Sequence, residues 1–404
     1  MTDRPIDRLP DRVADRLSRF HIETPSWGYA DTGTRFGKFP QDAAAITFDD
    51  KLDDAAHVHR LTGCCPTVAV HVLWDFELDG VAPQTAAAAA KQAAESRGVR
   101  IGSINPNLFQ DAEYKLGSLC NADAEVRQRA MDHVRLSIEL GRHTGSDLLS
   151  LWLADGTNYP GQGSFTQRKR WLSEGLRALH GDMPDGMTML IEYKPFEPAF
   201  YHTDIADWGM ARAYAEAAGP RAKVLVDTGH HLPATNIEHI VAFLIDDGLL
   251  GGFHFNDSKY ADDDVTMGSI DPYQLFRIFV EIVSAEHARG TDLDIAYMID
   301  QSHNLKPKIA ATLQTVDTAQ ANFAKALTVD QDALASARAS GDIIAAEGVL
   351  RDAFEQDIRP ALRAWRASQG LPPDPLREHR ESGYEAKAAA DRAPRKPGGA
   401  SSYA

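Results

Sequence analysis

Three carboxylates and one imidazole stand at or beside the ends of four short apolar runs in the second half of the chain. They are Glu192, Asp227, His254 and Asp300. Carboxylate oxygens and imidazole nitrogens together suit Mn²⁺, Co²⁺, Zn²⁺ or Mg²⁺. A single polar residue at a strand end often only caps the helix that follows. Four successive cases are harder to explain in that way, and they predict a metal site.

A second group of ligand types lies in the loops after two of these runs. His230 follows Asp227 by three residues, and Asp262 and Asp264 come after His254. An acidic loop is more often simply solvated, and neither feature is strong evidence alone. Together they would complete a second metal site in which Asp227 is shared between the two ions.

Lys194 stands two residues after Glu192 and therefore projects to the same side of an extended strand. Burying an ammonium group is costly unless an anion lies near it. A lysine beside a metal ligand therefore indicates contact with a substrate oxygen, which the lysine would polarise.

The apolar runs have the length of strands buried on both faces, and they lie at 188–193, 223–227, 252–256 and 294–300. Helix-length segments separate them, which predicts parallel βα units. Four earlier runs lie at 22–27, 67–73, 99–104 and 148–153. Eight such units predict an α/β protein, a closed (β/α)₈ TIM barrel.

We assign residues 1–306 to the barrel, with a surface helix before its first strand. Residues 307–390 show mainly helical signals and exceed what the last barrel unit requires. We expect this C-terminal helical extension to bury an apolar stripe against other subunits of a homotetramer. Residues 391–404 are small, polar and rich in Pro and Gly, and we expect them to be disordered.

The composition excludes several partners. The formal net charge is −16, and Lys and Arg do not cluster outside the short tail, which argues against nucleic acid. No apolar run approaches the roughly 18 to 20 residues of a membrane span. The N-terminal segment lacks the apolar core of a signal peptide, so we expect a cytoplasmic protein. Cys64, Cys65 and Cys120 form no CxxC pair and are expected to be buried thiols.

The ordered motifs IEYKPFEP, VDTGHH, FHFNDSKYADDD and MIDQSHN resemble those of the L-rhamnose isomerases of the xylose isomerase-like superfamily, and most of all its broad-specificity bacterial branch. The resemblance extends from about residue 20 to residue 304 and more loosely into the C-terminal region. It implies interconversion of L-rhamnose and L-rhamnulose, tolerance for other aldoses, and two divalent ions per subunit, foremost Mn²⁺.

The resemblance also implies roles for individual residues. The first ion would be held by Glu192, Asp227, His254 and Asp300, and the second by Asp227, His230, Asp262 and Asp264. The implied catalytic residues are Lys194, His71, Asp300 and His230. The residues implied to contact the sugar are His71, Trp74, Trp152, Glu192, Lys194 and Phe36, of which Phe36 would reach a neighbouring subunit's site. A strand histidine such as His71 is otherwise most often a satisfied core residue, and Trp152 is more simply a core residue.

Three other functions remain open from the residues alone. A ketose 3-epimerase of the same barrel would use one ion and a pair of glutamates, whereas an endonuclease would need a basic groove. A non-catalytic sugar-binding module would not need Lys194. For an isomerase, every matched carboxylate is a metal ligand and His71 is the one free base, which favours hydride transfer from C2 to C1 over an enediol. The spacing does not rank L-rhamnose against L-mannose, L-lyxose or D-allose.

Overall fold

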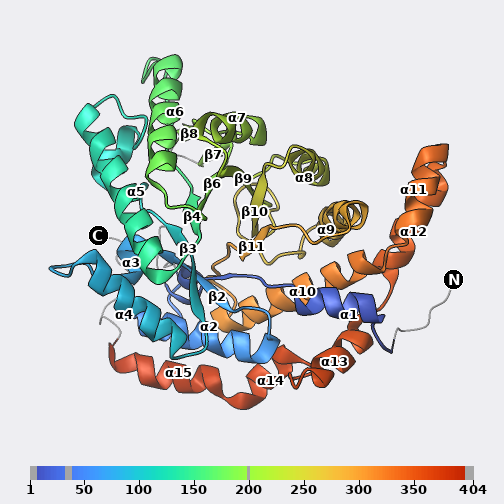
Figure 1. The fold of residues 1–404 in the computed structure, drawn as a ribbon. Helices are drawn as coiled ribbons and strands as arrows, with labels where there is room; N and C mark the ends of the chain where they lie inside the picture. Colours follow the sequence, from blue (N-terminus) through green and yellow to red (C-terminus); the bar gives the residue numbers. More distant parts are fainter. Residues whose placement is uncertain (1–6, 32–38, 198–200, 396–404) are drawn as a thin grey trace.

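The computed structural model describes residues 7–31, 39–197 and 201–395. Phe36 and residues 396–404 of the predicted disordered tail lie outside the described residues. Within these ranges, parallel strands form a central barrel, helices surround it, and further helices follow towards the C-terminus (Figure 1). No helix of the described ranges is both long and apolar enough to cross a membrane.

Eight parallel strands form one sheet whose spatial order is the order of the chain. They are β1 (Thr24–Pro25), β2 (Thr67–His71), β3 (Arg100–Asn105), β4 (Leu148–Leu151), β6 (Thr188–Glu192), β9 (Ala222–Asp227), β10 (Leu250–Phe255) and β11 (Ala296–Ile299). Just before β1, the Glu23 N–H donates to the Tyr297 carbonyl, and the Ile299 N–H donates to the Glu23 carbonyl. These bonds join the first strand to the last, and the predicted TIM barrel is confirmed.

Helices connect the strands and cover the outside of the barrel (Figure 1). The main ones are α2 (Phe48–Thr62), α4 (Pro83–Glu95), α5 (Ala124–Thr144), α6 (Phe165–Asp182), α7 (Trp208–Ala218), α8 (Ile237–Asp246), α9 (Pro272–Arg289) and α10 (Lys308–Thr328). The short ones are α1 (Asp11–Ser18), η1 (Ser26–Tyr29), α3 (Val72–Asp75) and η2 (Ala112–Leu116). Local signals set the ends: Thr47 and Asp50 form a capping box at the start of α2, and Gly63 ends it in left-handed backbone (φ 71°). The three cysteines are buried free thiols, as predicted.

An apolar layer inside the barrel lies directly beneath the predicted ligands. Leu190, Leu225 and Met298 pack together there, apart from the larger core that surrounds the barrel. Each stands two residues before a predicted ligand, and residues two apart share one face of a strand. The ligands therefore point into the barrel at its C-terminal mouth, where TIM-barrel enzymes carry their active sites.

A second, antiparallel sheet joins β5 (Gly156–Thr157), β7 (Phe196–Glu197) and β8 (Tyr201–Thr203). The Gly-containing, polar composition of residues 155–163 predicts a turn, but residues 156–157 form a strand because β8, far along the chain, pairs with them. Beside this sheet, the Lys194 N–H donates to the Ile205 carbonyl at 3.0 Å, and the Thr203 hydroxyl donates to the Lys194 carbonyl. The sheet thus fixes the backbone that carries Lys194.

The helices after α10 fall into two groups (Figure 1). α11 (Gln331–Ser340) and α12 (Ile343–Glu355) form a hairpin that projects from the barrel. α13 (Arg359–Ser368), α14 (Pro375–Ser382) and α15 (Tyr384–Arg392) run back along the barrel, and η3 (Ala393–Arg395) follows them. This second group buries Ile358, Leu362 and His379 within its own chain. Part of the extension therefore covers its own barrel, unlike the expected contact with other subunits.

A buried pair of histidines joins the C-terminal helices to the barrel. His57 Nε2 on α2 lies 3.0 Å from His379 Nδ1 on α14, and the Tyr384 ring stacks on His57. Glu385 Oε2 lies 3.3 Å from the other ring nitrogen of His379. Burial, followed by the charges of His379 and Arg60, lowers the pKa of His57 to about 4.

We expect acid to weaken the fold as the pH falls from the ordinary histidine pKa of 6.5 towards 4. In this window the unfolded chain protonates His57 and the folded chain does not, so the proton favours unfolding. His57→Gln should remove roughly 1–3 kcal/mol of this pH dependence, measured by urea unfolding at neutral and acidic pH. The exposed His287 on α9 supplies the matched control, His287→Gln, which should keep the wild-type dependence. An unchanged dependence in His57→Gln would contradict the assignment.

Candidate metal centre and active site

The four strand-end ligands converge at the barrel mouth. One potential ligand atom from each of Glu192, Asp227, His254 and Asp300 lies within 4.8 Å of the other three. Glu192 and Asp227 end β6 and β9, His254 lies in β10, and Asp300 follows β11. The first three side chains are buried, and that of Asp300 is 23% exposed. The structure thus brings together all four residues of the first predicted set, with one side of the cluster open to the mouth.

The cluster fits a divalent cation. Buried carboxylates repel one another, and burial, reinforced by the charges of Glu192 and Asp300, raises the pKa of Asp227 to about 7. His254 Nδ1 lies 3.1 Å from Glu192 Oε2, yet neither ring nitrogen of His254 has a hydrogen-bond partner in the described structure. A metal ion would bind the lone pair of one ring nitrogen and neutralise the crowded carboxylates.

His230 joins this cluster from the loop after β9. Its Nε2 lies 3.1 Å from Asp262 Oδ1 and 3.9 Å from Asp227 Oδ2, and its Nδ1 lies 3.0 Å from the Tyr193 carbonyl oxygen. Asp264 is buried two residues after Asp262, in left-handed backbone with φ 47°. Backbone strain of this kind tends to cluster at functional sites. His230 thus contacts Asp262 and lies near Asp227, and the second ion site, with Asp264 as a ligand, stays a prediction.

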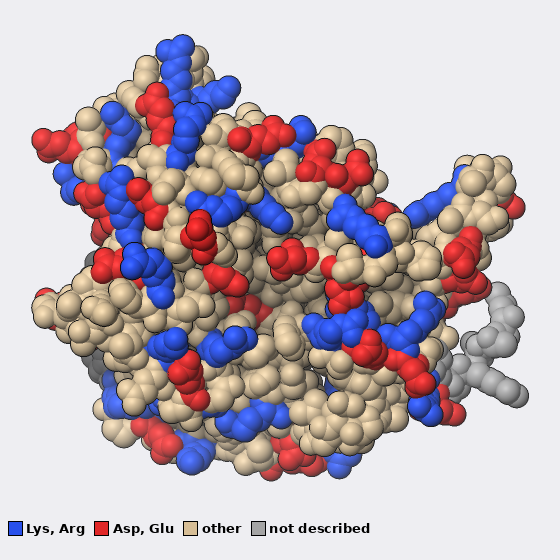
Figure 2. Space-filling view, viewed as in Figure 1, with Lys and Arg blue, Asp and Glu red and all other residues tan. Residues whose placement is uncertain are grey.

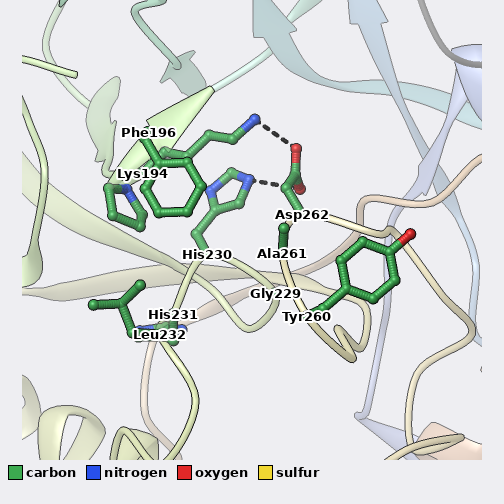
Figure 3. Close-up of a pocket in the computed structure, with 10 residues that line it drawn as sticks. Lys194, Phe196, Gly229, His230, His231, Leu232, Tyr260, Ala261 and Asp262 are labelled. Atoms are coloured by element: carbon green, nitrogen blue, oxygen red, sulfur yellow. Dashed lines mark hydrogen bonds and ion pairs between the residues drawn. The ribbon is translucent and has the colours of Figure 1, made fainter. Parts of the chain in front are cut away.

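Lys194 lies against the same loop (Figure 3). Its Nζ lies 2.5 Å from Asp262 Oδ2, contacts Glu197, and lies 5.2 Å from the centre of the Trp152 ring. Burial opposes the charge, but Asp262 and Glu197 outweigh burial and raise the pKa of Lys194. The lysine therefore stays an ammonium group beside both predicted ligand sets.

An arc of rings runs around the mouth from Asp300 to Lys194. The indole N–H of Trp27 donates to Asp300 Oδ1 at 2.9 Å, and Lys194 stands over the ring at the other end. Neighbouring ring centres along this aromatic arc are 4.2 to 5.8 Å apart, in the order Trp27, His71, Trp74, Phe109 and Trp152. The arc sets apolar faces beside a charged cluster, which suits a ligand with both C–H and hydroxyl groups.

His71 is a neutral member of the arc. Burial, followed by the charges of Lys51 and His254, lowers its pKa to about 3. Its backbone N–H donates to Asp75, which also binds the buried Lys51 ammonium at 2.6 Å. The ring Nδ1 has no hydrogen-bond partner in the described structure. His71 can therefore hydrogen-bond a hydroxyl group, and it is a weak base.

Three contacts of the site escaped the sequence analysis. From the sequence alone, Trp27 is a loop aromatic that could simply pack on its own barrel, yet its indole N–H donates to Asp300, 273 positions away. Phe109 joins the arc, and Glu197 binds Lys194 from three positions along the chain. Trp27 and Phe109 both lie just beyond strand ends, at the same mouth as the ligands. That position in the sequence could have identified both as site residues. Phe36 lies outside the described residues, so its predicted contact stays a prediction.

Comparison with known proteins gives the same fold and a chemical class. The sequence matches the family described as xylose isomerase-like TIM barrel over residues 69–296. A probable sugar isomerase from Rhizobium meliloti is 39% identical over 387 residues, which cover 95% of this chain and 88% of that protein. The xylose isomerase of Thermus thermophilus is 26% identical over 188 residues, covering 44% of this chain and 48% of that enzyme.

A crystal structure of D-psicose 3-epimerase in the presence of D-fructose is similar in fold. The TM-score is 0.51, and the match covers 76% of this chain and 97% of that chain at 14% sequence identity. At this identity the likeness shows the barrel fold alone.

We expect His254→Gln to weaken Mn²⁺ binding at the strand-end cluster by at least about tenfold, because it replaces an imidazole nitrogen by a neutral amide, a poor ligand. The measurement is equilibrium dialysis of chelator-treated protein against Mn²⁺. His239→Gln, at an exposed position on α8, is the matched control and should bind Mn²⁺ as the wild type does. Equal binding by His254→Gln and the control would remove His254 from the ligand set.

Proposed function

Because the chain belongs to the family of xylose isomerase-like TIM barrels, we propose that it is a metal-dependent aldose–ketose isomerase that converts L-rhamnose to L-rhamnulose and tolerates other aldoses. One observation carries this proposal. Lys194, charged and buried, lies between Asp262 and Glu197 beside the strand-end cluster. A cation held there is suited to stabilising negative charge on a sugar oxygen.

We propose two ion positions, and the convergence of the strand-end ligands supports the first. Glu192, Asp227, His254 and Asp300 would hold the first ion, and Asp227, His230, Asp262 and Asp264 the second, with Mn²⁺ the foremost candidate and Co²⁺, Zn²⁺ and Mg²⁺ as alternatives. Bound there, divalent ions supply Lewis-acid stabilisation of charge that develops on sugar oxygens. A ketose 3-epimerase, the second candidate, would use one ion and two glutamates, whereas here Asp300 takes the place of the second glutamate.

Charge on the surface argues against an endonuclease of the same barrel. Lys and Arg are interspersed with Asp and Glu over the face that Figure 2 shows, and the net charge is −16. A nucleic-acid groove needs clustered cations to neutralise phosphates. The small, mixed polar and aromatic mouth fits a monosaccharide better.

In the proposed reaction the residues of the mouth bind and orient an open-chain aldose. Lys194 donates a hydrogen bond to O1, and neutral His71 binds a sugar hydroxyl. Trp74, Phe109 and Trp152 exclude water and present apolar faces to the C–H groups of the sugar. Such faces suit a 6-deoxy sugar such as L-rhamnose, whose C6 is a methyl group, since burying a methyl contributes about 0.8 kcal/mol.

The residue inventory favours direct transfer of hydrogen from C2 to C1. An enediol route needs a base beside C2 with a pKa near the working pH. The clustered carboxylates are proposed ligands, Glu197 is paired with Lys194, and His71 has a pKa of about 3. A hydride shift needs no base at carbon. Hydrogen leaves C2 with its electron pair and bonds to C1, the proton of the C2 hydroxyl passes to O1, and Lys194 stabilises the charge on O1 as C1 is reduced and C2 is oxidised.

We expect the protein treated with a chelator and refilled with Mn²⁺ to isomerise L-rhamnose in D₂O without placing deuterium at C1 of the product. NMR of the ketose product measures the deuterium content at C1. Turnover of L-mannose, L-lyxose and D-allose measures the tolerance for other aldoses. Chelated protein without added metal should be inactive. Full activity after chelation would refute the metal assignment, and one deuterium per turnover at C1 would establish the enediol route. Epimerisation of ketoses without aldose turnover would favour the second candidate.

We also propose a homotetramer in which the α11–α12 hairpin contacts another copy of this chain. Ile343 and Ile344 at the hairpin turn are 78% and 85% exposed, and the hairpin stands away from the barrel (Figure 1). Burying an isoleucine contributes about 1.5–3 kcal/mol, so a second copy that covers both would gain stability. Phe36 would cross to the neighbouring site in the same assembly.

Introducing charge at the hairpin should therefore weaken the assembly. The double substitution Ile343→Asp and Ile344→Asp should lower the mass that light scattering measures at micromolar concentration. Phe165→Asp changes an equally exposed apolar residue on α6 and serves as the control, with the wild-type mass expected. A wild-type protein that is monomeric and active would refute the assembly.

A further inference from the structure

Asn256, the residue after β10, lies at the centre of the strand-end cluster. It stands two residues after His254 on the same face and is 2% exposed. Its Nδ2 lies 3.0 Å from both carboxylate oxygens of Asp227 and 3.2 Å from the main-chain oxygen of Asp300. All three partners are acceptors, which requires the amide nitrogen to face them. One carboxamide thus links three neighbouring strands at the level of the cluster.

The backbone of Asn256 is hydrogen-bonded to Thr228, which follows the neighbouring strand β9. The Asn256 N–H donates to Thr228 Oγ1 at 3.0 Å, and that hydroxyl donates to the Asn256 carbonyl at 2.7 Å. A second donor to Asp227 comes from its own loop, where the Gly229 N–H donates to Asp227 Oδ1 at 2.7 Å. A Cβ at position 229 would lie 2.1 Å from Asn256 Oδ1, so glycine is required for this approach. The Asp227 carboxylate is therefore fixed by two donors, the Gly229 N–H from the loop after β9 and the Asn256 amide from the residue after β10.

The unpaired carboxamide oxygen of Asn256 indicates that the side chain is present for its N–H groups. Asn256 Oδ1 is buried and has no hydrogen-bond partner in the described structure. Leaving a buried acceptor unpaired is unfavourable. An apolar side chain would avoid that cost, so the two N–H groups are the reason for an asparagine here. An aspartate would lack these donors and would add a like charge beside Asp227.

We infer that Asn256 is a positioning residue that orients Asp227 for both ions, an inference that rests on the two-ion site proposed above. By donating to Asp227, its amide fixes the rotation of a carboxylate that belongs to the same cluster as His254 and lies 3.9 Å from His230 Nε2. Its second N–H holds the backbone of Asp300. Asn256 itself contacts neither substrate nor ion. Its effect passes through the ligands, as in metal sites whose outer partners orient the first ligands.

The test measures metal binding independently of turnover. Chelator-treated wild type, Asn256→Ala and Asn121→Ala are titrated with Mn²⁺ by calorimetry, and the number of ions and both affinities are compared. Asn121 is the matched control, since it is 4% exposed, donates through Nδ2 to the Gly117 carbonyl, and lies outside the cluster. We expect Asn256→Ala to weaken both steps by about 10–100-fold and Asn121→Ala to weaken neither.

The remaining outcomes separate this inference from the proposed function. A wild type that binds no Mn²⁺ would refute the proposed function, whereas a wild type that binds two ions, with unchanged affinity at either step in Asn256→Ala, would overturn the inference alone. Equal weakening in Asn121→Ala would also overturn it, because the effect would then be one of general stability. If Asn256→Ala does not fold, the isosteric Thr228→Val replaces it. That variant loses the hydroxyl that holds Asn256, and wild-type affinity in it would equally overturn the inference.

Discussion

Bringing three carboxylates and an imidazole to one point, with all but Asp300 buried, is the constraint on which the rest of the structure depends. Like charges held this close inside a barrel oppose folding, and burial together with the charges of Glu192 and Asp300 raises the pKa of Asp227. Neighbouring cations and hydrogen-bond donors stabilise the carboxylates. Burial alone would raise the pKa of Glu192, but His254 and His230 outweigh it and lower that pKa to about 2. Parallel strands supply the geometry, because their carboxyl ends meet at one mouth.

The same constraint explains the division of the mouth into a charged floor and an apolar arc. The second half of the chain contributes the charged groups, which are the strand-end ligands and the ion pair of Lys194 with Asp262. The first half contributes the rings, and the two halves meet where the Trp27 indole binds Asp300. A barrel of eight strands makes this division possible, since each half-barrel faces the other across the mouth.

The sequence specified the strands and the strand-end ligands because both depend on local periodicity. Two-residue alternation fixes which side chains point inward, so Glu192 and Lys194 could be placed on one side without a structure. Contacts between distant segments were beyond such reasoning. The bond from Trp27 to Asp300 exists only once the barrel closes, and the pairing of β5 with β8 depends on a loop far along the chain. Helices α13 to α15 carry helical periodicity that is the same whether their apolar faces meet their own barrel or another copy.

Several buried polar atoms at the barrel mouth lack a hydrogen-bond partner within the described residues. Protein interiors pair nearly all such atoms. In the described structure the unpaired ones include His71 Nδ1, Trp152 Nε1 and both ring nitrogens of His254, besides others far from the mouth such as Gln331 Nε2 and Gln356 Oε1. The four atoms of His71, Trp152 and His254 belong to the aromatic arc or to the strand-end cluster. Packing alone would select against each of these features. At the mouth, a bound ligand would supply the missing partners, with polar groups for the arc and a cation for the cluster.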